Sequence, residues 1–394
     1  MNAFIHHIST LTPECSYTQT FARDQLKDLA PNERARRLTH AIYSRSGIEK
    51  RHSVCRDFVP GEERQLYKVG ATGTLLSPTT GARNAVYSAA SRILAVDLAR
   101  KALEDAPGFT AQDVTHVVFA SCTGFMNPGP DYHIIRELGL PQSVERYTLG
   151  FMGCYAAFPA LRMAGQFCEA NPRAVVLVMC LELCSLHMQI NDQPDSILAN
   201  SLFADGAAAA IVSARQPEPG VPAYQLGRFI SSLVPAGEAD MAWDIGNEGF
   251  NIVLSSYVPD IIGANLQPLL EGIFQEQDMR VGDIEEWAVH PGGRAILDKV
   301  EQSMTLPDGA LDVSRHVLRD YGNMSSATVL FVLKELLEAA STESASVCAL
   351  AFGPGLTVET ALLHRVGGPA PASSHAAPAE AEPVVPSQAE MVMV

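Results

Sequence analysis

Hydrophobic positions along the chain fall into two kinds of pattern. Over residues 84–106 the apolar side chains recur mostly at helical spacing, so this stretch predicts an amphipathic helix, and a shorter helix is expected over 132–138. The segments 115–121 (THVVFAS) and 174–181 are almost wholly apolar and predict buried strands. The small-residue run AAAAIVSA after Gly206 fits another packed strand. Helices that alternate with buried strands predict an α/β protein.

The second half of the chain repeats this order at a constant offset. Asn323 follows Cys154 by 169 positions, and His290, at the end of one apolar strand, follows Ser121, at the end of another, by the same number. In the same register GNMSSATVLFVLKEL lies over GCYAAFPALRMAGQF, and SVCALAF lies over LVMCLEL. Such a repeat predicts a duplicated α/β architecture with equivalent loops close to a pseudo-twofold axis. We therefore expect Cys154, His290 and Asn323 to lie near that axis.

Cys154 stands at the head of a stretch, GFMGCYAAFPALRMA, in which nearly every side chain is small or apolar. The pattern predicts a buried helix that Cys154 opens, with the positive end of the helix dipole beneath the thiol. With a base nearby, the pKa of the thiol should fall well below its free value of about 8.5 and yield a nucleophilic thiolate. A packed core cysteine is the alternative, because free cysteines are among the most buried residues.

Composition narrows the class of protein. The chain has 394 residues, of which 47% are hydrophobic and 18% charged, and its formal net charge is −16. This balance is typical of a globular protein with a large core, and it argues against nucleic acid as a partner. One local exception is a basic stretch that could hold a phosphorylated small molecule or form a solvated helix face: Arg34, Arg36, Arg37, Arg45, Lys50 and Arg51.

The eight cysteines are scattered and show no metal-ligand spacing. They predict reduced thiols in a cytoplasmic protein without a metal site. The N-terminal MNAFIHHIST lacks the pattern of a signal peptide, and the longest apolar run is too short to span a bilayer, so no membrane partner is expected.

Three regions are expected along the chain. Residues 1–215 would form an N-terminal half that carries Cys154, and residues 216–366 a C-terminal half that carries His290 and Asn323. Residues 367–394 are rich in Pro, Ala, Ser and Glu, and we expect a disordered tail because such a segment buries too little apolar surface to offset its ordering entropy.

Taken together, Cys154, His290 and Asn323 supply a nucleophile, a base and an amide donor. A thiol can form an acyl thioester, an imidazole can deprotonate it, and N–H groups can stabilise a developing oxyanion. Papain-like proteases use the same residue types in the same chain order. Their cysteine, however, lies near the mature N-terminus in a CGSCW-like setting, whereas Cys154 is in the middle of the chain, so peptide hydrolysis is disfavoured.

Four long segments are distinctive: WAVHPGGRAILDKVE, DYGNMSSATVLFVL, AFGPGLTVET and SLFADGAAAAIV. With them the chain resembles the type III polyketide synthases, the chalcone-synthase-like branch of the thiolase fold, over roughly residues 1–366. The resemblance implies an α/β fold in duplicated α-β-α-β-α layers, a homodimer, and a catalytic triad of Cys154, His290 and Asn323. Cys122 and the segment ELCSLHMQ look closer to bacterial members, which include tetrahydroxynaphthalene and alkylpyrone synthases.

The activity implied is that of a decarboxylating acyltransferase. An acyl-CoA starter would load onto Cys154, repeated condensation with malonyl-CoA would lengthen it, and the product would cyclise in the same cavity as an alkylpyrone, alkylresorcinol or tetrahydroxynaphthalene. The substrates are CoA thioesters, and no cofactor or metal is required. Neither the starter, nor the number of extensions, nor the ring closure follows from the sequence.

The resemblance also implies binding residues. Gatekeeping positions fall at Phe203 and Ile252, where a branched aliphatic side chain would open the cavity. The full set of implied cavity contacts is Phe203, Cys122, Thr123, His187, Ile252, Ser325, Gly353 and Pro354. The implied CoA contacts are Arg45, Lys50, Arg51, Gly292, Gly293 and Ala295.

Two other members of the thiolase fold remain as alternatives. A ketoacyl-ACP synthase III of fatty-acid synthesis shares the fold and the triad but would stop after one condensation on malonyl-ACP. A non-catalytic partner protein of the same fold would lack triad residues, and all three are present in this chain. The GFGPGLTVE-like and LFADGAA segments favour the polyketide synthase.

Overall fold

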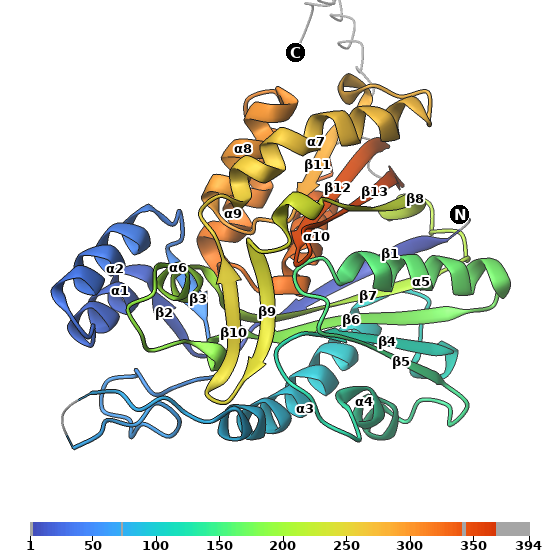
Figure 1. Ribbon diagram of the computed structural model, residues 1–394. Helices are drawn as coiled ribbons and strands as arrows, with labels where there is room; N and C mark the ends of the chain where they lie inside the picture. Colours follow the sequence, from blue (N-terminus) through green and yellow to red (C-terminus); the bar gives the residue numbers. More distant parts are fainter. Residues whose placement is uncertain (1–2, 72–73, 341–343, 368–394) are drawn as a thin grey trace, which may run out of the picture.

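A nine-stranded sheet runs through the computed structural model, which describes residues 3–71, 74–340 and 344–367 (Figure 1). Its strand order is β11-β12-β13-β8-β1-β7-β6-β4-β5. The strands are β1 (Phe4–Leu11), β4 (His116–Ser121), β5 (Glu145–Gly150), β6 (Val175–Leu183), β7 (Asp205–Ser213), β8 (Ala223–Leu233), β11 (Glu286–Val289), β12 (Ala345–Gly353) and β13 (Thr357–Val366). Of the tail expected at 367–394, all but Gly367 lies outside the described residues.

The two halves of the sheet have the same pairing. In the first half β4 and β6 are parallel and β6 and β7 antiparallel, and in the second half β11 and β12 are parallel and β12 and β13 antiparallel. β1 and β8 join the halves by an antiparallel pairing of Phe4 with Gln225 and Ile5 with Tyr224. The duplicated α/β architecture predicted from the repeat is confirmed.

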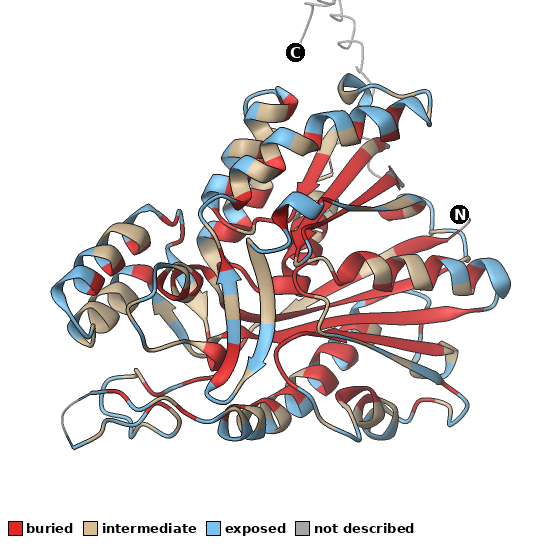
Figure 2. Cartoon of the chain, viewed as in Figure 1, coloured by how far each residue is buried: buried red, intermediate tan, exposed pale blue. Residues whose placement is uncertain are grey.

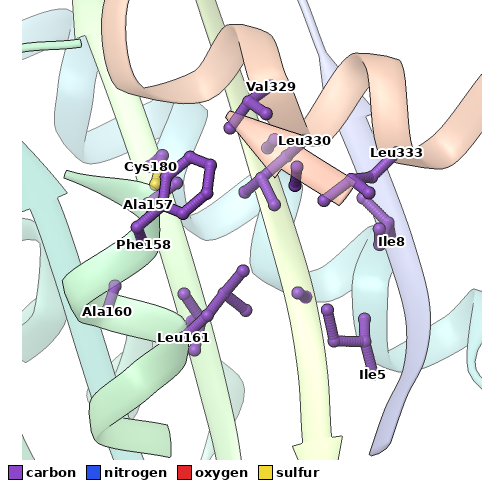
Figure 3. Packing of buried hydrophobic residues seen from close by; sticks show 14 of the residues in the cluster. Ile5, Ile8, Ala157, Phe158, Ala160, Leu161, Cys180, Val329, Leu330 and Leu333 are labelled. Carbon is purple, nitrogen blue, oxygen red and sulfur yellow. The ribbon is translucent and has the colours of Figure 1, made fainter. Parts of the chain in front are cut away.

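Two helices form the layer between the halves. They are α5 (Ala157–Ala170) and α10 (Thr328–Glu338), and Leu161 and Leu330 from them pack with side chains of β1 and β6 (Figure 3). In β6, Val176 and Val178 join this central cluster. The residue between them, Leu177, points to the opposite face, as the two-residue period of a strand requires.

The outer faces of the sheet are covered by separate helices. On the first half, α3 (Thr80–Asp105) and α4 (Pro130–Leu138) cover the outward side chains of β4, β6 and β7. On the second half, α7 (Val258–Gln275) and α8 (Arg294–Met304) cover those of β11 and β12. Figure 2 shows that the strands are buried along most of their length while these helices expose one side. The chain therefore has the five layers that the resemblance implies.

The remaining elements lie outside the large sheet. Five of them gather at the left of Figure 1: β2 (Ser16–Thr18), α1 (Gln19–Asp28), α2 (Glu33–Arg45), β3 (Lys50–His52) and α6 (Pro194–Leu202). The strands β9 (Met241–Gly246) and β10 (Gly249–Leu254) stand near its centre, and α9 (Asp312–Tyr321) lies beside α8. α2 contacts α6, and α6 contacts β10. Residues of α2, α6, β9 and β10 form part of the wall of a cavity between the two halves of the fold.

The loop before α5 depends on a glycine. Gly153 has φ of +82°, and a Cβ atom there would lie 2.7 Å from Cδ of Pro354. Gly139, which ends α4, has φ of +64°, but a Cβ atom there would meet nothing within 4 Å. The two glycines share a left-handed backbone and differ in the space beside them.

We expect Gly153→Ala to lower the free energy of unfolding more than Gly139→Ala does. A left-handed alanine costs about 1 to 2 kcal/mol at either position. At position 153 the contact with Pro354 adds to this cost because the proline ring cannot rotate away. Urea unfolding of both variants measures the difference, and equal losses would show that the loop relaxes around the new methyl group.

Candidate active site

A cavity of about 610 Å³ lies between the two halves of the fold. Its wall is formed by α2, α6, the hairpin β9–β10, the first turns of α7 and α8, and the central loops. Cys154, His290 and Asn323 all line it, although they come from three separate loops. The structure thus brings together the three residues that the internal repeat predicted to lie near one pseudo-twofold axis.

Cys154 lies in the turn that precedes α5, three residues before the helix begins at Ala157. The prediction that Cys154 itself opens the helix is therefore corrected. The chain reaches this turn through Phe151 and Gly153, both with positive φ, and the Phe151 N–H donates to the carbonyl of Ser121. The side chain of Cys154 is 9% exposed, and its Sγ is 4.0 Å from Oδ1 of Asn323.

The expectation of a lowered thiol pKa is wrong for this structure. Burial raises the pKa of Cys154 to about 11, and the Glu182 carboxylate acts in the same direction. Hydrogen bonding with Ser325 and Asn323 opposes the rise but does not cancel it. A buried thiol in such a site stays protonated at neutral pH, so it needs an adjacent proton acceptor to become a nucleophile.

His290 can supply that acceptor. It follows β11 directly, its backbone N–H donates to the Leu350 carbonyl, and it is 1% exposed. Both ring nitrogens are buried and have no hydrogen-bond partner within the described residues. Burial lowers the pKa of the imidazole to about 3, so the ring is neutral and can accept a proton at one nitrogen while it donates from the other.

Backbone pairing across the fold fixes the position of Asn323. Its N–H donates to the carbonyl of Leu202, and its own carbonyl accepts from the N–H of Ala204. In its side chain, Nδ2 donates to the Gly292 carbonyl at 3.2 Å and Oδ1 accepts from the N–H of Ser325 at 2.8 Å. The amide is thereby held with its nitrogen toward the loop that follows His290.

A buried carboxylate that was not predicted lies beneath the cavity residue Cys122. Glu182 is fully buried at the end of β6 and accepts hydrogen bonds from the Cys122 N–H, the Thr123 hydroxyl and the Ser326 hydroxyl. Burial raises the pKa of this carboxyl to about 6. Of the predicted contacts, Cys122 lines the cavity with its Sγ 3.3 Å from Oγ of Ser325, whereas Thr123 does not line it and serves the Glu182 network.

The predicted gatekeepers have an aromatic neighbour that sequence reasoning missed. Phe203 and Ile252 line the cavity together with Trp243, whose Nε1–H donates to the Cys122 carbonyl at 3.1 Å. Trp243 lies on β9, and it is one of only two tryptophans in the chain. The rarity of tryptophan was the one feature of the sequence that could have singled out Trp243. It did not indicate which side of the β9–β10 hairpin faces the cavity.

Of the four other predicted cavity contacts, two line the cavity and two do not. Ser325 and Pro354 line the cavity, but Gly353 faces the ring of Tyr155 instead. His187 does not line the main cavity, and both of its ring nitrogens are occupied, by the Thr123 carbonyl and the Phe250 N–H. Burial lowers the pKa of His187 to about 4, so it is a neutral wall residue.

Some of the predicted CoA contacts line the cavity and others do not. Arg45, Gly292, Gly293 and Ala295 line the mouth of the cavity, and Arg294, which was not predicted, lies among them. Lys50 is exposed on β3 and does not line the cavity.

The structure corrects the prediction that Arg51 contacts CoA. Its guanidinium donates to the side chain of Gln19 and to the carbonyls of Asn200 and Phe203, at 3.0, 2.8 and 2.6 Å. Its Nε and Nη1 hold it against Gln19 and the backbone of Asn200 and Phe203, and Arg51 does not line the catalytic cavity.

None of the described helices has an apolar stretch of the length that crossing a bilayer requires. The described His, Cys, Asp and Glu residues form no group of three that could hold a metal ion.

Family models match nearly the whole chain. The N-terminal domain of chalcone and stilbene synthases matches residues 3–217, and the C-terminal domain of the same family matches residues 225–367. A curated relative, "Probable polyketide synthase 1" of Dictyostelium discoideum, is 31% identical over 371 residues. The match covers 93% of this chain but only 12% of that much longer protein.

Solved structures agree with this assignment. The C-terminal type III polyketide synthase domain of the Dictyostelium hybrid "Steely1" has a TM-score of 0.84 at 30% identity and covers 93% of this chain and all of that chain (100%). PKS-I of the brown alga Ectocarpus siliculosus has a TM-score of 0.83 at 28% identity, with coverage of 92% and 98%. The 1,3,6,8-tetrahydroxynaphthalene synthase of Streptomyces coelicolor A3(2) has a TM-score of 0.79 at 29% identity, with the same coverage. The chain belongs to the chalcone and stilbene synthase family and is a type III polyketide synthase, a condensing acyltransferase.

Proposed function

We propose that this polyketide synthase loads an acyl-CoA starter on Cys154, extends it by repeated condensation with malonyl-CoA and cyclises the product in the same cavity. One observation carries the proposal: a buried thiol, an imidazole with two unpartnered nitrogens and an oriented amide line one cavity of about 610 Å³. The active unit would be a homodimer, as the family resemblance implies.

Loading begins with a proton transfer. As Sγ of Cys154 attacks the thioester carbonyl, its proton passes to a ring nitrogen of His290, which is neutral and free to accept it. The carbon–sulfur bond to CoA breaks, and the departing CoA thiolate takes up the proton. The result is an acyl thioester on Cys154 and a neutral His290.

Chain extension requires that the negative charge of an enolate be stabilised. When malonyl-CoA loses carbon dioxide, the electron pair of the broken carbon–carbon bond forms an enolate whose oxygen carries negative charge. An N–H of His290 and an N–H of the Asn323 amide would stabilise that oxygen. The enolate carbon then attacks the Cys154 thioester, the carbon–sulfur bond breaks, and the lengthened chain leaves on CoA to be reloaded.

The mouth of the cavity suits CoA. Arg45 ends α2 and Arg294 begins α8, and both line the cavity on its outer side. Their positive charges would attract the CoA phosphates, while the backbone of Gly292 and Gly293 leaves room for the pantetheine arm. A long acyl starter, giving an alkylpyrone or alkylresorcinol, suits the aliphatic Ile252, and a malonyl-primed naphthalene product is the competing outcome.

The first test is product analysis. Purified protein should convert malonyl-CoA and a series of acyl-CoA starters into multiply extended products that mass spectrometry identifies, and Cys154→Ala should give none. Cys15→Ala is the matched control because Cys15 lies outside the cavity, and it should retain the wild-type products. A single condensation seen only with malonyl-ACP would instead support a ketoacyl-ACP synthase III.

The second test separates decarboxylation from condensation. Cys154→Ala should retain malonyl-CoA decarboxylation, because the enolate donors remain in place. Asn323→Ala should lower the decarboxylation rate about a hundredfold, as loss of one oxyanion donor does in other enzymes.

Carbon dioxide release from labelled malonyl-CoA measures both rates. Asn171→Ala, an exposed asparagine at the end of α5, is the control and should keep the wild-type rate. If Asn323→Ala decarboxylates as fast as wild type, the proposed role of the amide is wrong.

A further inference from the structure

Three arginines, Arg34, Arg45 and Arg294, form a row that leads to the mouth of the active-site cavity. The first two lie on α2, which carries four arginines and one glutamate in a chain with 44 acidic and 28 basic residues. Arg34, Ala41 and Arg45 lie within about 40° of one another round the helix, because each residue turns it by about 100°. Leu38, Ala41 and Arg45 line the cavity, so this face of α2 borders its mouth.

The two arginines on α2 are exposed and available to a partner. Elsewhere on the helix Arg36 forms an ion pair with Asp28, at 3.4 Å from Nη2 to Oδ1. In the part of the chain that the structure describes, neither Arg34 nor Arg45 has a carboxylate within 4.0 Å. Arg45 follows Arg34 by 11 positions, which is a rise of about 16 Å along the helix.

Arg294 continues the row on the other side of the mouth. It begins α8, its side chain is 60% exposed, and its Nε lies 3.5 Å from Oδ2 of Asp298. Gly47, just past the end of α2, lies beside it, since a Cβ atom there would be 3.5 Å from Cβ of Arg294. Arg45 and Arg294 therefore flank the mouth, whereas Arg34 does not line the cavity.

A single CoA molecule accounts for only part of this row. Its phosphates would lie at the mouth, where Arg45 and Arg294 line the cavity and where α7 and α8 begin. Helix N-termini attract phosphate, so the mouth suits a phosphopantetheine arm whether a nucleotide or a protein carries it. Arg34, about 16 Å farther along α2, is not needed for that contact.

We propose that this face of α2 docks an acyl carrier protein (ACP), an acidic protein that presents a fatty acyl starter on phosphopantetheine, and that Arg34 recognises the carrier itself. The inference rests on the proposed loading of Cys154 and adds a second donor of the starter, while malonyl-CoA still extends it. The net charge of −16 would repel an acidic protein, and the arginine row is where attraction can overcome that repulsion. Leu38 and Ala41, both partly buried between the arginines, provide the apolar contact that protein interfaces combine with arginine.

The transfer needs no further reactant. Sγ of Cys154 would attack the thioester carbon of the carrier-bound acyl group while its proton passes to His290. The carbon–sulfur bond to phosphopantetheine then breaks, and the departing thiolate of the carrier takes up the proton. CoA and the carrier differ only in what lies beyond the phosphate of the arm, and Arg34 lies on that side of the mouth.

Two starters that share the arm separate the roles of the arginines. We would measure kcat/KM with malonyl-CoA and either dodecanoyl-CoA or dodecanoyl-ACP, using the ACP of a bacterial fatty-acid synthase. Arg34→Glu should lower kcat/KM for dodecanoyl-ACP at least about tenfold, because it sets like charges against each other, and should leave kcat/KM for dodecanoyl-CoA unchanged. Arg45→Glu should lower both. Arg173→Glu, at an exposed arginine between α5 and β6, is the matched control and should change neither.

A binding measurement tests the docking without the chemistry. Fluorescence anisotropy of labelled dodecanoyl-ACP would be followed as the Cys154→Ala variant is added. The Kd should rise with salt, and it should be at least about tenfold higher when Arg34→Glu is combined with Cys154→Ala.

The remaining outcomes are distinct. Activity with dodecanoyl-CoA alone, together with no binding of dodecanoyl-ACP or with equal Kd values in the two variants, overturns the inference and leaves the proposed function intact. The outer part of α2 would then be a solvated helix face. Binding that depends on Arg34, with no acyl group on Cys154 of the wild type by mass spectrometry, supports the docking surface and overturns delivery of the starter.

Discussion

The site depends on one backbone pairing between the two halves of the fold. Asn323 and Phe203 form a parallel bridge, in which Asn323 donates to Leu202 and accepts from Ala204. Gly322 permits the close approach, since it has φ of +72° and a Cβ atom there would lie 3.0 Å from the Leu202 carbonyl oxygen. The pairing sets Asn323 of one half beside Phe203 of the other. The backbone positions of these two cavity residues are therefore fixed relative to each other by hydrogen bonds.

Burial gives the thiol and the imidazole complementary roles. The pKa of Cys154 is raised to about 11 and that of His290 is lowered to about 3, and desolvation is the largest cause in both. A lone charge on either buried group is costly. In the proposed loading step, a proton transfer from the thiol to the imidazole would create the two opposite charges together, and attack on the thioester would then consume the negative charge.

The sequence predicted the fold and the proximity of Cys154, His290 and Asn323 because both follow from local patterns and from their repetition. Strands such as β4 and β6 are nearly continuous apolar runs, and the offset of 169 positions that relates Asn323 to Cys154 is visible without any structure. Glu182 and Arg51 were not predicted in their actual roles because those depend on partners far away in the chain. Glu182 binds Ser326, and Arg51 binds carbonyls of α6 and of Phe203. A charged residue near a phosphate-binding mouth and one that braces a backbone carbonyl look alike in sequence, and only the long-range contacts distinguish them.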